Sequence, residues 1–571
     1  MALVECSSEG VLRAPPFAPI RPRISNRHRR DEPVSLTAEG LAPVPAERMT
    51  ALRLNLCAAR VGGAFWARPA GLPTSGMTVF RPPDARRARS WRDALLRRHA
   101  SGRLWALLPP TAWARRFAAE TARLGVGASL GDIDPWSVFD QAGAVVADPE
   151  GEIGLLAAVA GLDVAAGPED DARPAEDVLA RMRREFVGRT DYRHPFEARA
   201  AECEEIVDVM ADWRRVLAAN RGLAACVGVA PWKRREVRQL LYGGERPIAF
   251  RRSARSAVAL AVARGGAVAV WPSRTPRGLE DAAAAAGVPL VRIEDGFVRS
   301  AGLGSDLWPP GSIIVDRRGV HFDPDRPSDL EAILQETTFD PALLARARRL
   351  ADLVRDLRVT KYNLGGGPAP RPDPARETVL VTGQVEDDLS FVLGGGQGNL
   401  ALLRRARTLE PLARILFKPH PDVERGHRKG RVPDGEALAY ADQIVRDTTM
   451  PALLDAVDRV HTVSSLSGFE ALLRGRPVVA HGKPFYAGWG LTTDLQPIDR
   501  RSRRLTLEEL VAGALILYPR YIDPRSRLPC PPEVFVRRLA EPTAARSNPL
   551  VWLRRLQGEG RKWAAQFGAG G

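Results

Sequence analysis

Short apolar runs alternate with amphipathic stretches along the second half of the chain. Six runs of five or six residues, rich in Val, Ile, Leu and Ala, have the length and composition of buried strands. They are AVAVW (267–271), PLVRI (289–293), TVLVTG (378–383), RILFK (414–418), RVHTV (459–463) and PVVAH (477–481). Between them, residues 342–357 and 399–409 repeat apolar positions at helical spacing. Strands that alternate with helices predict an α/β fold with parallel sheets covered on both faces.

A Gly- and Pro-rich segment, residues 365–377, interrupts this alternation. We expect it to link two Rossmann-like domains, with a ligand cleft between them at the carboxyl ends of the strands. Residues 1–48 are rich in Pro and Arg without periodicity and are expected to be disordered. The expected organisation is 1–48 disordered, 49–204 an N-terminal αβ region, 205–370 and 371–524 the two Rossmann-like domains, and 525–571 a helical tail.

A segment of the N-terminal αβ region resembles a segment of the second Rossmann-like domain. Residues 145–167 align without gaps on residues 459–481, so that Val146 matches Val460 and Gly154 matches Gly468. Both segments read as strand, turn, helix and strand, a rhythm that any αβ unit shares. If the repeat is genuine, the N-terminal region contains a truncated copy of the second Rossmann-like domain. Its chemistry is then lost, because Glu150, Gly151 and Leu156 stand where the other copy has Ser464, Ser465 and Glu470.

The charge of the chain, formally +15, is compatible with an anionic partner. Nucleic acid is the first class to consider, since basic side chains neutralise its phosphates. Only six residues are lysine, however, and the rest of the positive charge is arginine mixed with abundant Ala, Gly and Pro. This composition is typical of genome-wide codon bias, so we expect no nucleic-acid partner.

The cysteines and the apolar runs exclude several other classes. The five cysteines contain no CxxC pair, which argues against a disulfide framework and against a zinc site. The longest apolar run is interrupted by Arg264, and the N-terminus lacks the order of a signal peptide. We expect a soluble cytoplasmic protein without a metal or another cofactor.

Acidic residues follow two of the predicted strands. Glu294 and Asp295 directly follow the run 289–293. Glu386, Asp387 and Asp388 follow the strand that ends at Gly383. In an ordinary structural interpretation, Asp295 caps a turn and Asp388 caps a helix. Capping needs one acid after Gly383 rather than three, so carboxylates at a cleft are the alternative interpretation.

Basic and hydroxyl side chains follow two more strands. Lys418 is the last residue of the run 414–418, and His420 follows it between two prolines, which keep the segment extended. A cation and an imidazole at a strand end suit a phosphate leaving group. Ser464, Ser465 and Ser467 lie between a strand and a helix, where hydroxyls and helix N–H groups can bind an anion. Glu470 in the first turn of that helix either bonds two ribose hydroxyls or simply suits the helix dipole.

These motifs resemble those of the retaining β-Kdo transferases of bacterial capsule assembly, the KpsC type. The resemblance covers residues 205–524, a single module of a protein that often carries two, and order and spacing agree throughout. The matching pieces are RIEDGFVRSAGLGSD (292–306), SIIVDRRGVHFDPDRPSDLEAIL (312–334), TKYNL (360–364), GQVEDDLS (383–390), KPHPDV (418–423), SGFEALLRGRPVVAHGKPFYAGWGLT (467–492) and YPRYIDP (518–524). The acidic, His-Pro and serine motifs also resemble those of bacterial sialyltransferases.

The resemblance implies a GT-B-like architecture and a role for each motif. Asp388 is implied as the nucleophile that forms a glycosyl-enzyme intermediate, and Glu294 or Asp295 as the base that deprotonates the acceptor. The donor is implied to be CMP-Kdo, and Arg299 is a plausible partner for its sugar carboxylate. The residues implied to bind CMP are Gly383, Gln384, Lys418, His420, Ser464, Ser465, Ser467 and Glu470.

The resemblance also implies partners and a location. The acceptor is a lipid-linked Kdo glycolipid at the inner face of the cytoplasmic membrane, and other capsule assembly and export proteins are further candidate partners. A transferase for another CMP-ulosonic acid and a non-catalytic capsule assembly protein are the alternatives. The tail, residues 547–571, interleaves aromatic and basic residues, which favours contact with an anionic membrane; packing of its first helix on the N-terminal Rossmann-like domain is the competing interpretation.

Overall fold

The computed structural model describes residues 11–17, 25–27, 44–171, 178–188, 190–300, 308–361, 366–371, 373–426 and 428–541. Two compact units are present, and each is described by itself. Unit 1 comprises Met1–Arg221, Tyr242–Pro247 and Arg525–Leu528. Unit 2 comprises Gly222–Leu241, Ile248–Pro524 and Pro529–Gly571. The predicted tail segment 547–571 lies outside the described residues.

The first sheet of unit 2 has the strand order β10-β9-β11-β12-β13-β20-β21. Its four parallel strands are β10 (Ala249–Phe250), β9 (Leu223–Val227), β11 (Ala267–Val270) and β12 (Leu290–Asp295). Its antiparallel extension is β13 (Ser312–Asp316), β20 (Pro519–Ile522) and β21 (Pro529–Cys530). Alternate residues of β11 belong to different core clusters, Ala269 to one and Val268 to the other, so both faces of this sheet are buried.

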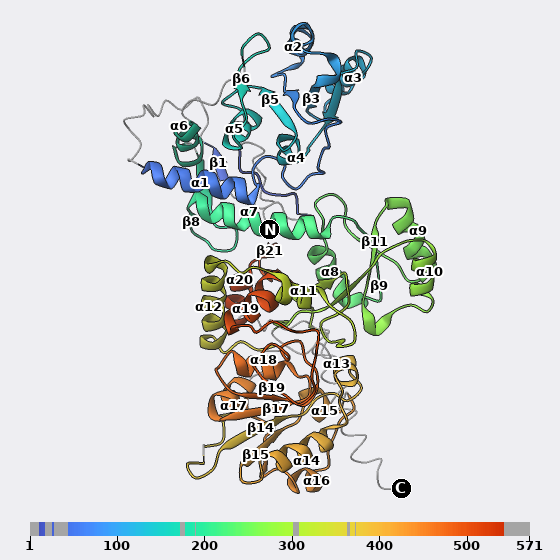
Figure 1. Ribbon diagram of the computed structural model, residues 1–571, viewed down its shortest axis with the longest axis vertical. Helices are drawn as coiled ribbons and strands as arrows, with labels where there is room; N and C mark the ends of the chain where they lie inside the picture. Colours follow the sequence, from blue (N-terminus) through green and yellow to red (C-terminus); the bar gives the residue numbers. More distant parts are fainter. Residues whose placement is uncertain are drawn as a thin grey trace. The chain divides into compact units, whose positions relative to one another are not determined.

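The second sheet of unit 2 is parallel throughout, with the order β16-β15-β14-β17-β18-β19. Its strands are β14 (Thr378–Thr382), β15 (Arg414–Lys418), β16 (Gln443–Ile444), β17 (Arg459–Thr462), β18 (Val478–Ala480) and β19 (Thr493–Asp494). The helices that connect them are α13 (Leu389–Leu393), α14 (Asn399–Leu409), α15 (Pro421–Glu424), α16 (Asp434–Leu438), α17 (Met450–Ala456) and α18 (Leu466–Leu472). Figure 1 shows this part in orange. All six predicted strands are present within about two residues.

The chain returns to the first sheet before the expected boundary at residue 524. β20 pairs antiparallel with β13, with Ser312 opposite Tyr521, so the residues of β20 do not belong to the second sheet as expected. The helices on this side of unit 2 are α8 (Arg234–Leu240), α9 (Ala254–Arg264), α10 (Leu279–Ala285), α11 (Asp329–Glu336), α12 (Pro341–Asp356), α19 (Leu507–Val511) and α20 (Pro532–Ala540). A short apolar strand carries no mark of the sheet that it joins, so the sequence could not reveal this crossing.

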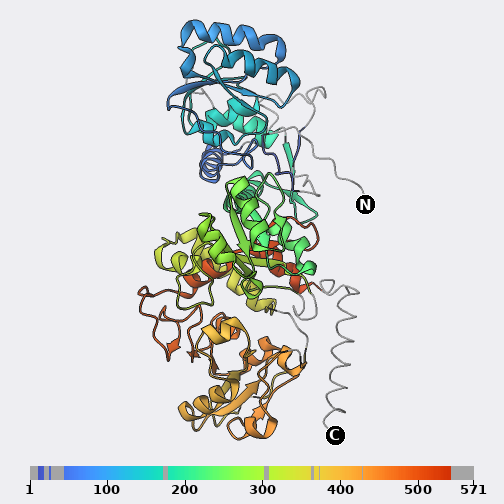
Figure 2. The same ribbon diagram turned by 90° about the vertical axis from the view of Figure 1, so that its right-hand side faces the viewer.

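Unit 1 contains a parallel sheet of order β4-β3-β2-β5-β6 (blue and cyan in Figure 2). Its strands are β2 (Met77–Phe80), β3 (Leu104–Leu108), β4 (Gly127–Leu130), β5 (Ala142–Val146) and β6 (Val164–Ala165). Its helices are α1 (Ala46–Ala59), α2 (Ala85–Arg98), α3 (Ala112–Ala122), α4 (Pro135–Phe139), α5 (Glu152–Val159), α6 (Val178–Met182) and α7 (Cys203–Asn220). A small antiparallel sheet contains β1 (Ser25–Arg27), β7 (Thr190–Arg193) and β8 (Ala200–Ala201). If the strands of each sheet are numbered along the chain, both this sheet and the first five strands of the second sheet of unit 2 have the spatial order 3-2-1-4-5.

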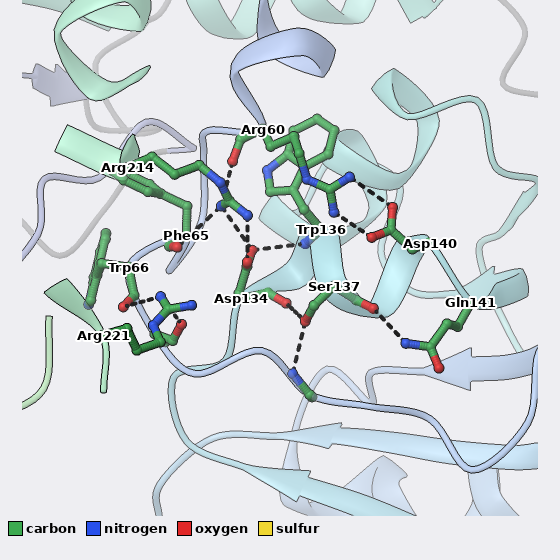
Figure 3. Close-up of polar contacts among 12 residues, drawn as sticks. Arg60, Phe65, Trp66, Asp134, Trp136, Ser137, Asp140, Gln141, Arg214 and Arg221 are labelled. Atoms are coloured by element: carbon green, nitrogen blue, oxygen red, sulfur yellow. Dashed lines mark hydrogen bonds and ion pairs between the residues drawn. The ribbon is translucent and has the colours of Figure 1, made fainter. Parts of the chain in front are cut away.

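Buried Asp134 ties several segments of unit 1 together (Figure 3). Its carboxylate accepts hydrogen bonds from Arg214 at 2.7 and 3.2 Å and from the Trp136 N–H at 3.2 Å. Arg214, on α7, also donates to the carbonyls of Arg60 and Phe65. The aspartate thus joins the start of α4, the long helix α7 and the loop after α1.

The structure corrects one expectation about the N-terminus. Residues 11–17 lie in the segment expected to be disordered, yet the side chains of Val11, Leu12 and Phe17 are buried. The Val11 carbonyl accepts a hydrogen bond from the Gly63 N–H at 2.8 Å. Apolar side chains spaced between prolines provided enough burial to order this short piece, although the segment as a whole lacks periodicity.

Candidate functional site

A cavity of about 1110 Å³ lies in unit 2, between the carboxyl ends of strands from its two sheets. From the first sheet it is lined by the segments that follow β9, β11 and β12, and from the second by those that follow β14, β15 and β17. Every site residue named from the sequence lines this one cavity. They are Glu294, Asp295, Arg299, Gly383, Gln384, Asp388, Lys418, His420, Ser464, Ser465, Ser467 and Glu470.

Asp388 lines the cavity and also caps α13. Its carboxylate accepts hydrogen bonds from the Ser390 N–H at 3.0 Å and from the Ser390 hydroxyl at 2.7 Å. Burial raises the pKa of Asp388, but the hydrogen bonds from Ser390 and the charges of Lys361 and Arg428 outweigh burial and hold the pKa below its usual value. The carboxylate is therefore ionised and fixed in orientation, as a nucleophile requires.

The two acids beside Asp388 have structural partners. Asp387 pairs with Arg428 at 3.1 Å, and Glu386 accepts a hydrogen bond from the Asn399 N–H at 2.7 Å, at the start of α14. The three acids that follow β14 thus have three different partners. The carboxylate of Asp388 is the one that Ser390 orients in the cavity wall.

Glu294 and Asp295 differ in their surroundings although they are adjacent. Asp295 is held by the Arg299 guanidinium at 2.7 Å and by the Lys233 ammonium at 3.0 Å. Burial raises the pKa of Asp295, but these two cations outweigh burial and hold it well below its usual value. For Glu294, burial and the neighbouring Asp295 charge raise the pKa to about 7. Glu294 is thus the carboxyl group of the pair that can exchange a proton near neutral pH.

Arg299 is committed to the protein itself. Its guanidinium donates to Asp295 at 2.7 Å, to the Ser300 hydroxyl at 2.7 Å and to the Trp308 carbonyl at 2.9 Å, and the residue is 1% exposed. These contacts use three of the five N–H groups, and burial leaves the other two little access to a sugar carboxylate. The interpretation of Arg299 as the sugar-carboxylate partner therefore does not fit the structure, and we assign it to holding Asp295.

Lys418 and His420 enter the cavity at the end of β15. The Lys418 ammonium donates to the carbonyl of Arg446, and burial lowers its pKa. His420 caps α15, and its Nδ1 accepts a hydrogen bond from the Asp422 N–H at 3.1 Å. Because Nδ1 acts as the acceptor, the proton of the neutral ring resides on Nε2, which can donate to an anion. Burial also lowers the pKa of His420.

Gln384 connects the end of β14 to the serine segment after β17. Its side-chain oxygen accepts from the Ser464 N–H at 2.8 Å, and its amide donates to the Ser464 hydroxyl at 3.1 Å. At neighbouring Gly383, a Cβ atom would lie 3.2 Å from the Phe417 ring, so glycine permits this close packing. These contacts fix the backbone groups at the edge of the sheet.

The remaining serines bond mainly to each other. Ser465 caps α18, and the Ser467 hydroxyl is hydrogen-bonded with the Ser465 hydroxyl at 2.7 Å and with the Thr382 hydroxyl at 3.1 Å. Glu470 accepts the Lys361 N–H at 3.0 Å, and burial raises its pKa to about 7. The serines and Glu470 thus lie where the sequence predicted, already engaged in internal hydrogen bonds.

Among the cavity residues that were not named from the sequence, Lys361 and His321 have notable contacts. Lys361 links both halves of unit 2, since its N–H bonds to Glu470 and its carbonyl accepts from the Arg299 and Ser300 N–H groups at 3.3 Å. His321 packs edge-on against Phe297 with ring centroids 4.8 Å apart, and its buried Nδ1 has no hydrogen-bond partner among the described residues. Burial lowers the pKa of His321 to about 3. Both residues lie inside matched motifs, TKYNL and SIIVDRRGVHF, which was the available signal.

Comparisons with known proteins identify the family of the chain and several relatives. A family model described as capsule polysaccharide biosynthesis protein matches residues 266–368 and 369–521. The capsule polysaccharide modification protein LipA of Neisseria meningitidis serogroup A is 38% identical over 356 residues, which are 62% of this chain and 50% of LipA. The lipopolysaccharide-processing protein LpsZ of Rhizobium meliloti is 43% identical over 257 residues, 44% of this chain and 58% of LpsZ.

Two solved structures are also similar in sequence. The chain is 33% identical to Thermosulfurimonas dismutans KpsC, beta Kdo 2,4 transferase, at a TM-score of 0.49. The match covers 98% of that structure and 56% of this chain. The beta Kdo 2,7 transferase of the same KpsC is also 33% identical, with 98% of it and 55% of this chain covered, at a TM-score of 0.45. The chain belongs to the capsule polysaccharide biosynthesis protein family.

The family match covers most of the cavity. Glu294, Asp388, His420 and Glu470 all lie within the matched residues, whereas Lys233 precedes them. The chain spans about half the length of the curated relatives it matches. Within the described residues of this capsule family member, no group of three or more His, Cys, Asp or Glu side chains is arranged to hold a metal ion. No helix of that part is long and apolar enough to cross a bilayer.

Proposed function

We propose that this protein is a retaining glycosyltransferase that transfers Kdo from CMP-Kdo to a Kdo-bearing glycolipid in capsule polysaccharide assembly. The observation that carries the proposal is the single cavity in which ionised Asp388, the acid pair at Glu294 and Asp295, and His420 come together. Sequence identity to two Kdo transferases supports the choice of sugar. In this proposal the two sheets of unit 2 are the two Rossmann-like halves of a GT-B-like enzyme.

In the proposed first step, the Asp388 carboxylate attacks the anomeric carbon of the sugar. A bond forms between the carboxylate oxygen and that carbon, and the bond to the CMP phosphate breaks, with its electron pair leaving on the phosphate. Lys418 and the Nε2–H of His420 supply positive charge and a hydrogen bond to that phosphate. Glu470 is proposed to bind the ribose through the carboxylate oxygen that does not hold Lys361.

In the proposed second step, the acceptor hydroxyl oxygen attacks the same carbon and releases Asp388. Glu294 takes the hydroxyl proton, because its raised pKa suits a base near neutral pH. Two displacements at one carbon give retention. Asp295, held by two cations, keeps its charge beside Glu294 and does not itself exchange a proton. No metal and no further cofactor has a step in this proposal.

The proposal is tested with the purified full chain, CMP-Kdo and a synthetic Kdo-lipid acceptor, with products identified by mass spectrometry and NMR. We expect Asp388→Ala and Asp388→Asn to lower transfer at least ~100-fold, because the covalent pathway is lost. Asparagine is also a good N-cap, so the second variant separates chemistry from folding. Asp373→Ala, which breaks an ion pair with Arg376 at 3.0 Å outside the cavity, is the control and should remain active.

Two results would contradict the proposal. Near-normal transfer by Asp388→Asn would remove the nucleophile assignment, and absence of transfer by the wild-type chain would remove the activity. A panel of other CMP-activated acidic sugars in the same assay identifies the donor. Contact of the enzyme with the inner face of the cytoplasmic membrane and with other capsule proteins is part of the same proposal, since a lipid-linked acceptor is presented at that surface.

A further inference from the structure

One end of the cavity contains no residue that contacts the donor or takes a proton in the proposed chemistry. It is formed by the segments that follow β9 and β11, which contain Trp232, Lys233, Trp271, Ser273 and Arg274. In the first sheet the order β9-β11-β12 places β11 beside β12, the strand that ends in Glu294, and β9 beyond it. These residues therefore extend the cavity away from the proposed base, along neighbouring strand ends.

The aromatic residues at this end are held rigidly. The Lys233 ammonium lies 3.8 Å from the centroid of the Trp271 ring and 5.3 Å from that of Trp232, while it also bonds to Asp295 at 3.0 Å. Trp271 is buried, and Trp232 is partly exposed. A fixed cation between two indole rings and a carboxylate leaves the rings little freedom to move. Rigid aromatic side chains bury the apolar face of a ligand ring at low entropic cost.

Arg274 contributes a positive charge that the protein does not neutralise locally. It ends the short helix η4 (Pro272–Arg274), is exposed, and forms no ion pair with any carboxylate among the described residues. Lys233, the other cation at this end, is bound to Asp295. Arg274 is thus the group here that an incoming anion would meet, and its planar fork matches a carboxylate.

The size of the cavity supports a second ligand. Sites for one small molecule usually enclose about 300–1,000 Å³, and this cavity encloses about 1110 Å³ across both sheets. A donor whose phosphate lies at Lys418 and His420 occupies the side of the second sheet. The end at Trp232 and Arg274 lies on the other sheet, where a bound acceptor would place its reacting hydroxyl at Glu294.

We propose that Trp232, Trp271, Ser273 and Arg274 form the acceptor subsite, in which Arg274 binds the carboxylate of an acidic sugar unit and the indole rings contact its apolar face. This inference rests on the proposed function and adds the residues that select the acceptor. Trp232 precedes the residues matched by the family model, whereas Trp271, Ser273 and Arg274 lie within them. A phosphate of a lipid carrier has similar charge, and the test separates the two anions.

The test compares Arg274→Gln with Arg277→Gln in the full chain. Arg277 lies three residues away, is also exposed, and does not line the cavity, so it is the matched control. We expect Arg274→Gln to raise the KM for the acceptor about 10- to 100-fold, the usual effect of losing a charge-assisted hydrogen bond. Its affinity for CMP, measured by calorimetry, should equal that of the wild type. Arg277→Gln should change neither quantity.

A second arm identifies the anion. The wild-type chain should discriminate against an acceptor whose sugar carboxylate is methyl-esterified, whereas Arg274→Gln should treat the ester and the free acid alike. Equal discrimination by both proteins would overturn the inference. Discrimination that instead follows the presence of a phosphate on the lipid would also overturn it, in favour of carrier recognition.

The inference can fail separately from the proposed function. If the wild-type chain transfers no sugar, binding of the methyl glycoside of Kdo alone is followed by saturation-transfer NMR. Binding by the wild type and by Arg277→Gln, but not by Arg274→Gln, would support the subsite without the transferase activity. Absence of binding, or equal binding by all three proteins, would reject it.

Discussion

Glu294 and Asp295 are neighbours in the sequence, but their partners give them opposite tendencies to hold a proton. The cations Arg299 and Lys233 contact Asp295 and outweigh its burial, so its pKa is depressed. Glu294 has burial and the negative Asp295 beside it, so its pKa rises to about 7. The pair therefore separates into a fixed charge and a group that titrates near neutral pH, an arrangement that recurs where one acid must act as a base.

This difference predicts a pH dependence of kcat/KM for the acceptor. A base must be deprotonated, so activity should fall as the pH drops below about 7. Lys233→Met removes a cation that lowers the pKa of Glu294 and should move the acidic limb to higher pH. Asp295→Asn removes the anion that raises the pKa of Glu294 and should move the acidic limb of the pH profile to lower pH. Shifts of both variants in the same direction, or no shift, would reject Glu294 as the base.

The sequence predicted residues that line one cavity, but it did not reveal the contacts that each of them makes. Polar groups at strand ends are visible in a sequence because they interrupt apolar runs, and they converge because parallel strands share one edge. Arg299 was misread because its partners, Asp295 and the Trp308 carbonyl, depend on the course of a loop. Lys361 was not named because its importance arises from a linker that touches both halves of unit 2.

At the scale of elements, Asp134 carries much of the connection between α4, α7 and the loop after α1. Its side chain is 2% exposed and pairs with Arg214, which is 19% exposed. Removal of one partner from a buried pair leaves the other charge uncompensated, at a typical cost of about 3–5 kcal/mol. Asp134→Ala should therefore destabilise unit 1 strongly.

Chemical denaturation measures this prediction. The control is Asp140→Ala, which breaks the exposed ion pair with Arg60 and should change the free energy of unfolding by less than about 1 kcal/mol. Because the chain has two units, the transition that belongs to unit 1 must be followed separately, by hydrogen exchange of peptides from that unit. Tryptophan fluorescence would not separate the two transitions, since both units contain tryptophans. Equal stability of the two variants would show that the Asp134 pair is not a structural anchor.

The elements themselves were predictable wherever local pattern decides. The predicted helix at 399–409 is α14, and that at 342–357 is α12 within one residue. The return of β20 to the first sheet was not predictable, since pairing with β13 is decided by tertiary packing. Residues 11–17 were likewise misjudged, because their burial depends on unit 1 rather than on their own periodicity.

At the scale of the whole molecule, the internal repeat acquires a structural counterpart. The segment 145–167 forms β5, α5 and β6, and its partner 459–481 forms β17, α18 and β18. Both sheets have the same order over five parallel strands. Yet the edge of the unit 1 sheet is built differently, since the Glu152 carboxylate pairs with Arg13 at 2.9 Å and Glu150 pairs with Arg184 at 2.9 Å. The Glu150 carboxylate of unit 1 thus stands at the position that Ser464 occupies in the repeat.

We therefore expect one CMP site per chain, in spite of two similar sheets. Glu150 replaces Ser464 in the repeat, and a carboxylate repels the phosphate that a hydroxyl could bind. Calorimetric titration of the full chain with CMP should give a stoichiometry near one, and His420→Ala should weaken binding about 10- to 100-fold because it removes the Nε2 donor. His194→Ala alters the chain's other His-Pro dipeptide, in unit 1, and should bind CMP as the wild type does. Two sites per chain, or residual tight binding in His420→Ala that His194→Ala removes, would show that unit 1 has kept a nucleotide site.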